Sequence, residues 1–125
     1  MKLSFFILIF LVLVSACTKE LKYDKTQMYK MGTKVEPTLE LILPKDINSG
    51  IKCSDYGKGC LSGVTAKVRL VEIILVEFDT EENARNEALK LDQYYTRNWL
   101  LDDVRGEPVL ESFVKQAFNA KKASK

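Results

Sequence analysis

The sequence predicts an α+β fold, a small two-layer sandwich in which about three strands form a sheet and two helices cover one of its faces. Apolar and polar residues alternate at residues 39–43 and 64–78, which indicates strands. Two stretches with helical apolar spacing follow them. The chain has 125 residues, of which 46% are hydrophobic and 29% are charged, and these values are typical of one globular domain rather than a disordered chain.

The two predicted strands differ in how much of their surface is covered. Residues 39–43 carry leucine at alternate positions and stop at a proline, as expected for a half-exposed strand. Residues 64–78 form the strongest element, because they alternate at first and are apolar on both sides around Ile74, as in a central strand. Glu72 falls in the inward phase, so either a bulge resets the register at residues 71–72 or a carboxylate faces the interior. We favour the bulge.

Each of the two predicted helices has a start signal and an apolar stripe. Asp79 or Thr80 can cap the first helix, whose apolar residues recur at steps of three and four as far as Tyr95. A short strand at residues 97–101 and an acidic turn follow. Pro108 then suits the first position of the second helix, and a wide apolar stripe comes after it.

This order of elements is close to a reduced ferredoxin-like arrangement, and it leaves the second face of the sheet without helices. That face must be polar, covered by the loop at residues 45–63, or paired with a partner. Its apolar candidates, Ile73 and Leu75, favour an interface with another protein or with a second copy of the chain.

Residues 1–17 carry the most specific signal in the chain. Lys2 precedes an apolar run at residues 3–14, which is short for a membrane span of about 20 residues. A cation, a short apolar run and small residues are typical of a signal peptide for export. The sequence Val14-Ser15-Ala16-Cys17 resembles the lipobox of bacterial lipoproteins. The resemblance implies cleavage before Cys17, a diacylglyceryl group on its sulfur and an acylated amino terminus carrying fatty acids such as palmitate.

The chain therefore divides into a signal peptide at residues 1–16, a lipidated cysteine with a flexible tether at 17–37, a single α+β domain at 38–120 and a basic tail at 121–125. The tether is predicted because residues 17–37 show no convincing periodicity. Thr18 stands where enteric-type sorting places an aspartate to retain a lipoprotein in the inner membrane. We therefore favour the outer membrane, facing the periplasm, over the inner membrane.

Two cysteines remain once Cys17 is assigned to lipid. Cys53 and Cys60 are separated by six residues, two of them glycines, so the spacer can turn tightly enough to join the sulfurs. In an exported protein such a pair predicts a structural disulfide. A redox pair is the alternative, although reactive pairs usually have two intervening residues.

The residue types that the chain lacks limit its chemistry. Histidine is absent, which excludes Ser-His-Asp triads, Cys-His dyads and histidine-ligated zinc. The net charge of +2 argues against nucleic-acid binding, which usually needs a strongly basic face. We expect no cofactor and no metal. The sequence thus predicts a non-catalytic binding or assembly module of the cell envelope, anchored in membrane lipid through acylated Cys17 and bound to another envelope protein or to itself.

Aromatic and polar side chains gather after the first predicted helix and could form the contact surface. The members of this group are Tyr94, Tyr95, Arg97, Trp99, Asp102 and Asp103. They could bind the edge of a peptide or a glycan. Such residues more often form a corner of the core, with their polar atoms exposed to solvent. The competing function is a histidine-free hydrolase or lyase that uses Asp102, Asp103 or Glu107 near Tyr95. The same turn could also supply some oxygen ligands for calcium, but EF-hand spacing is lacking.

Overall fold

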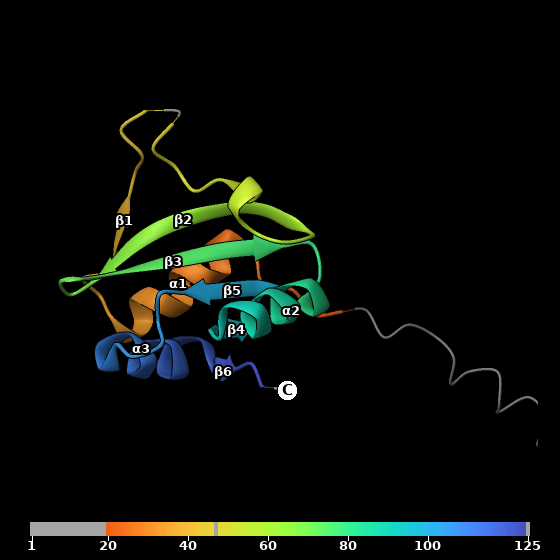
Figure 1. Cartoon of the computed structure of the whole chain (residues 1–125). Coiled ribbons are helices and arrows are strands. Elements are labelled where there is room, and N and C mark those ends of the chain that lie inside the picture. The colour runs from red at the N-terminus through yellow and green to blue at the C-terminus, as the bar shows by residue number, and fades with distance from the viewer. Residues whose placement is uncertain (1–19, 47, 125) are drawn as a thin grey trace, which may run out of the picture.

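Six strands form one antiparallel sheet, and helices pack on both of its faces (Figure 1). The computed structural model describes residues 20–46 and 48–124, so the predicted signal peptide and Cys17 lie outside the described residues. In chain order the elements are α1 (Lys25–Val35), β1 (Glu40–Ile42), the 3₁₀ turn η1 (Cys53–Asp55), β2 (Cys60–Val68), β3 (Val71–Phe78), α2 (Glu81–Leu91), β4 (Tyr94–Thr96), β5 (Trp99–Asp102), α3 (Pro108–Phe118) and β6 (Lys121–Lys122). The α+β class is confirmed, with more strands and one more helix than expected.

The sheet order β1-β2-β3-β5-β4-β6 explains why the helices lie on opposite faces. β3 and β4 run parallel with antiparallel β5 between them, and α2 connects them; β5 and β6 are related in the same way through α3. Both connections move across the sheet toward β6. However, the two strands joined by α2 are antiparallel to the two strands joined by α3. Two connections of the same right-handed sense therefore require α2 and α3 on different faces.

The prediction of helices on one face only is accordingly wrong. α2 buries Ala84 and Ala88 against Phe78 on one face, whereas α1 and α3 cover the other face. The two residues expected on a bare face, Ile73 and Leu75, are buried on the α1 and α3 side. Neither sheet face is therefore left as an uncovered apolar surface among the described residues.

The long strand predicted at residues 64–78 is a β-hairpin. Val68 pairs with Val71, and Arg69 and Leu70 form the turn between them, with Arg69 at a φ of 58° and the Leu70 side chain 91% exposed. The predicted bulge at residues 71–72 is absent from this part of the structure, because the hairpin turn itself changes the phase of the alternation. Glu72 is exposed, and the register irregularity lies between Cys60 and Ser62 instead.

Part of the predicted tether at residues 17–37 is helical. Asp24 caps α1, since its Oδ1 accepts a hydrogen bond from Gln27 N at 2.7 Å while its own N donates to Gln27 Oε1 at 2.9 Å. Met28 and Gly32 are buried, and α1 packs beside α3. The helix is stable because its narrow apolar stripe packs against the core. Local periodicity in the sequence does not reveal this packing.

The predicted basic tail is also part of the fold. Lys121 and Lys122 form β6, which pairs with β4, and Ala123 is buried on the α2 face. Other boundaries agree with expectation: Thr80 caps α2 through its Oγ1, α3 begins at Pro108, and Asn119 ends α3 in a left-handed conformation. Within the described residues, no helix combines the length and apolar character needed to cross a bilayer.

Candidate functional site

The structure distributes the predicted contact residues over both sheet faces. Alternation along β4 directs Tyr94 to the α3 side and Tyr95 to the α2 side. Trp99 is buried, and its Nε1 donates a hydrogen bond to Tyr23 O at 2.9 Å. Arg97 lies over the Tyr23 ring, with Cζ 5.7 Å from the ring centroid. These side chains form a corner of the core and do not meet on one surface.

The predicted acidic residues lie in different surroundings. Asp102 accepts a hydrogen bond from Tyr56 Oη at 2.9 Å, and burial together with this contact raises the pKa of Tyr56. Asp103 and Glu107 are exposed. Partial desolvation and the neighbouring Asp102 charge raise the pKa of Asp103. Within the described residues, no group of three or more histidine, cysteine, aspartate and glutamate side chains is placed to hold a metal ion.

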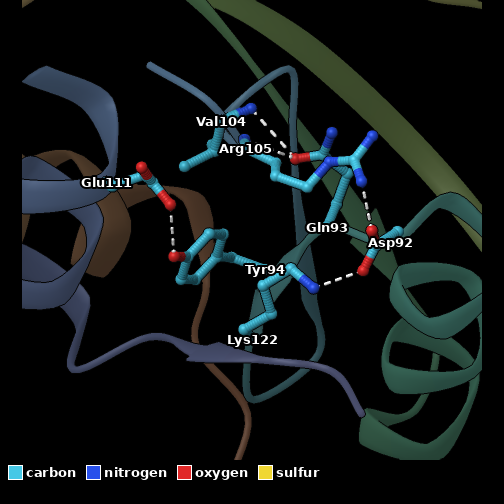
Figure 2. Close-up of polar contacts among 7 residues, drawn as sticks. All are labelled: Asp92, Gln93, Tyr94, Val104, Arg105, Glu111 and Lys122. Carbon is cyan, nitrogen blue, oxygen red and sulfur yellow. Dashed lines mark hydrogen bonds and ion pairs between the residues drawn. The ribbon is translucent and has the colours of Figure 1, made fainter. Parts of the chain in front are cut away.

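A polar network that the sequence did not indicate surrounds the start of β4 (Figure 2). Gln93 Oε1 accepts hydrogen bonds from the backbone N of Val104 and of Arg105, each at 3.0 Å. Asp92 forms ion pairs with Arg105 and Lys122, and the hydrogen bond from Lys122 lowers the pKa of Asp92. These contacts hold the loop before α3 and the strand after it, so their role is structural.

Tyr94 contributes a further link between the sheet and α3 (Figure 2). Its Oη donates to Glu111 Oε2 at 2.7 Å, and this hydrogen bond, with burial, raises the pKa of Tyr94 to about 12. The contact between Tyr94 and Glu111 thus links α3 to the sheet.

The predicted disulfide is confirmed. Cys53 and Cys60 are bonded, with a Cα–Cα distance of 5.4 Å. The loop that they close is also tied to α2, because Gly57 N donates to Glu87 Oε2 at 2.6 Å and Glu87 is only 5% exposed. The disulfide thus fastens a loop that covers part of the α2 face.

The structure adds a site that the sequence did not reveal, an apolar cavity of about 270 Å³ between α1 and the sheet. Its walls come from α1, β1, β2, β3, β5 and the end of α3. They are formed by Lys25, Met28, Tyr29, Leu39, Leu41, Ser62, Gly63, Val64, Leu75, Trp99 and Phe118. We refer to this site as the α1 cavity.

Local sequence explains why a hollow exists at this place. Gly63 contributes only backbone to the wall, because a Cβ there would point away from the cavity, 2.4 Å from Ile51 Cγ2 on the α2 side of the sheet. Ser62 is small, so no bulky β2 side chain fills the space at this end. Tyr29 and Leu41 are 47% and 41% exposed and mark the mouth of the cavity. The leucine alternation at residues 39–43 was the only sequence signal for this wall.

Two polar side-chain atoms in the interior of the wall already have partners. Trp99 Nε1 donates to a backbone carbonyl, and Ser62 Oγ donates to Glu77 Oε1 at 3.4 Å. Lys25 is the only charged residue among the wall residues. This arrangement favours an apolar ligand over one that needs several hydrogen bonds. In the comparisons with known proteins, no family model, no curated protein and no solved structure matches this chain.

Proposed function

We propose that this chain is a membrane-anchored lipoprotein of the cell envelope that binds another envelope component without catalysing a reaction. Acylated Cys17 provides the anchor, in the outer membrane facing the periplasm rather than in the inner membrane. The α1 cavity provides the binding site. The observation that carries the binding role is this open hollow, in which a nearly continuous apolar wall ends at partly exposed side chains.

Chain length supports a link between the anchor and the cavity. Lys25, at the cavity, follows Cys17 by only eight positions. Even a fully extended segment of that length spans about 28 Å. The anchor therefore restricts the α1 cavity to the zone next to the membrane. Two or three acyl chains hold such a protein stably, because each buried methylene contributes about 0.8 kcal/mol.

The anchor is tested by Cys17→Ala, with Thr18→Ala as the matched control. Because the alanine has no sulfur to modify, we expect the Cys17→Ala protein to accumulate as an unprocessed precursor without lipid. The control keeps processing and membrane attachment. Fractionation and intact mass measurement of both proteins check this. Normal cleavage and acylation in the Cys17→Ala protein would contradict the anchor.

The binding role is tested by placing a photo-crosslinking amino acid at Leu41, at the mouth of the cavity. Leu70, in the β2–β3 turn, serves as the exposed control because it is not a wall residue. After irradiation of intact cells, we expect a discrete adduct at Leu41 and none at Leu70. An adduct of twice the chain mass would identify self-association. The same weak, diffuse labelling at both positions would reject the binding role.

A further inference from the structure

The walls of the α1 cavity restrict the chemistry of its ligand. A peptide backbone or a sugar that enters loses hydrogen bonds to water, and the partnered polar atoms of Ser62 and Trp99 do not replace them. A hydrocarbon loses nothing on entry and gains contact with Met28, Leu75 and Phe118. The interior of the cavity therefore selects an apolar group.

Size distinguishes a hydrocarbon chain from a single side chain of a partner protein. An apolar cavity of about 150 Å³ already accommodates benzene. The α1 cavity, at about 270 Å³, is nearly twice that volume. One inserted phenylalanine or leucine therefore leaves much of it empty, and the walls forfeit contacts there. A flexible acyl chain can fill the remaining length.

Charge at the mouth indicates the head group. Lys25 is an exposed wall residue, and it is the only charged one among the described residues that form the wall. Asp24 and Glu77 carry negative charges nearby, but among the described residues neither forms an ion pair with Lys25. The Lys25 ammonium is thus available as a positive partner for an anion.

If the α1 cavity is the binding site, as proposed above, its ligand can be assigned. We propose that the α1 cavity binds a fatty acid, with the acyl chain inside and the carboxylate at Lys25. The acyl groups on Cys17 have the same hydrocarbon chemistry, but they are joined through bonds that leave no carboxylate. Lys25 therefore favours a free fatty acid over the anchor of the protein itself. The ligand class is a single-chain carboxylate amphiphile.

The experiment uses the protein as the cell makes it, purified from membranes and reconstituted into phosphatidylcholine vesicles. The probe is dodecanoic acid with a diazirine near its methyl end. After irradiation, peptide mass spectrometry locates the adducts. We expect them on wall residues such as Met28, Leu75 and Trp99, and we expect excess unlabelled dodecanoate to remove them.

Two matched pairs of variants test the geometry. Leu41→Asp places a carboxylate at the mouth and should reduce labelling at least about tenfold. Leu43→Asp, on the same leucine series but outside the wall, should not reduce it. Lys25→Glu should reduce labelling by dodecanoate about fivefold but leave labelling by the corresponding diazirine alcohol unchanged. Lys30→Glu should affect neither probe. Thermal unfolding confirms that each variant is folded.

Three results overturn the proposal. The first is labelling spread over exposed surface residues, which indicates partition from the vesicle. The second is labelling that Leu41→Asp leaves intact. The third is an unlabelled cavity in which Cys17 acyl chains give internal cross-links. If the Leu41 cross-linker captures a protein in cells while dodecanoate leaves the cavity unlabelled, the fatty acid proposal fails and the binding module stands.

Discussion

At the residue scale, one buried amide organises the loop that leads into α3. Gln93 is 9% exposed, and its Oε1 accepts hydrogen bonds from two consecutive backbone N–H groups. Val104, one of the donors, is fully buried, so water cannot replace its partner. The Gln93 side chain thus satisfies polar atoms that no secondary structure reaches.

Replacing Gln93 by leucine should leave both N–H groups without an acceptor. We expect the free energy of unfolding to fall by about 2 kcal/mol, since each buried unpaired group costs about 1–3 kcal/mol. Gln93→Glu retains an acceptor oxygen and should lose less. Gln116→Leu, at an exposed position of α3, is the control. Urea denaturation measures all three, and equal losses for Gln93→Leu and Gln116→Leu would refute the role of the amide.

At the element scale, α1 shows how tertiary contacts create a helix from a polar segment. Three lysines and few apolar residues made residues 25–35 resemble a tether. Gly32 lies against Leu39 and Phe113, and Met28 belongs to the same buried cluster, so the burial of α1 depends on contacts with residues outside the helix. One local signal was present, because Asp24 and Gln27 have the spacing of a capping box.

The capping box gives a prediction about α1. Asp24→Ala removes the acceptor for Gln27 N and should lower the free energy of unfolding by about 1 kcal/mol. Asp46→Ala is the control, because Asp46 accepts a hydrogen bond from Asn48 N in an exposed loop outside any helix. Hydrogen exchange should accelerate in the first turn of α1 for Asp24→Ala alone. Unchanged exchange there would show that packing on α3 is sufficient to hold the helix end.

At the scale of the whole molecule, apolar periodicity predicted α2, α3 and the apolar strands, and cysteine spacing predicted the disulfide. Neither pattern could predict which strands pair with each other. Arg69 and Leu70 are not typical turn residues, so a hairpin was read as one strand. Without that hairpin, the directions of β3 and β5 could not be derived, and these directions decide which face each helix covers. The α1 cavity depends on this arrangement together with α1, so local patterns could not reveal it.

The contacts of Asp92 join three parts of the molecule and give a prediction about pH. Asp92 ends α2 in a left-handed conformation, and it pairs with Arg105 of the loop before α3 and Lys122 of β6. The hydrogen bond from Lys122 is the main cause of its lowered pKa, and Arg105 adds to it. A carboxyl whose pKa is lower in the folded state stabilises the fold above its unfolded pKa of about 3.9.

This stabilisation should be lost as pH falls through the lowered pKa of Asp92. The pKa of Glu36 is also lowered, chiefly by the hydrogen bond from Thr38, so Glu36 likewise loses stabilising free energy as the pH falls. The raised pKa of Asp103 has the opposite effect on stability. We therefore expect the free energy of unfolding to fall as the pH decreases below about 4. Asp92→Asn, which keeps a residue suited to the left-handed conformation, should flatten this dependence, whereas Asp46→Asn should not. Urea denaturation across that range measures both, and parallel curves for Asp92→Asn and the unmodified protein would show that these ion pairs are too exposed to affect stability.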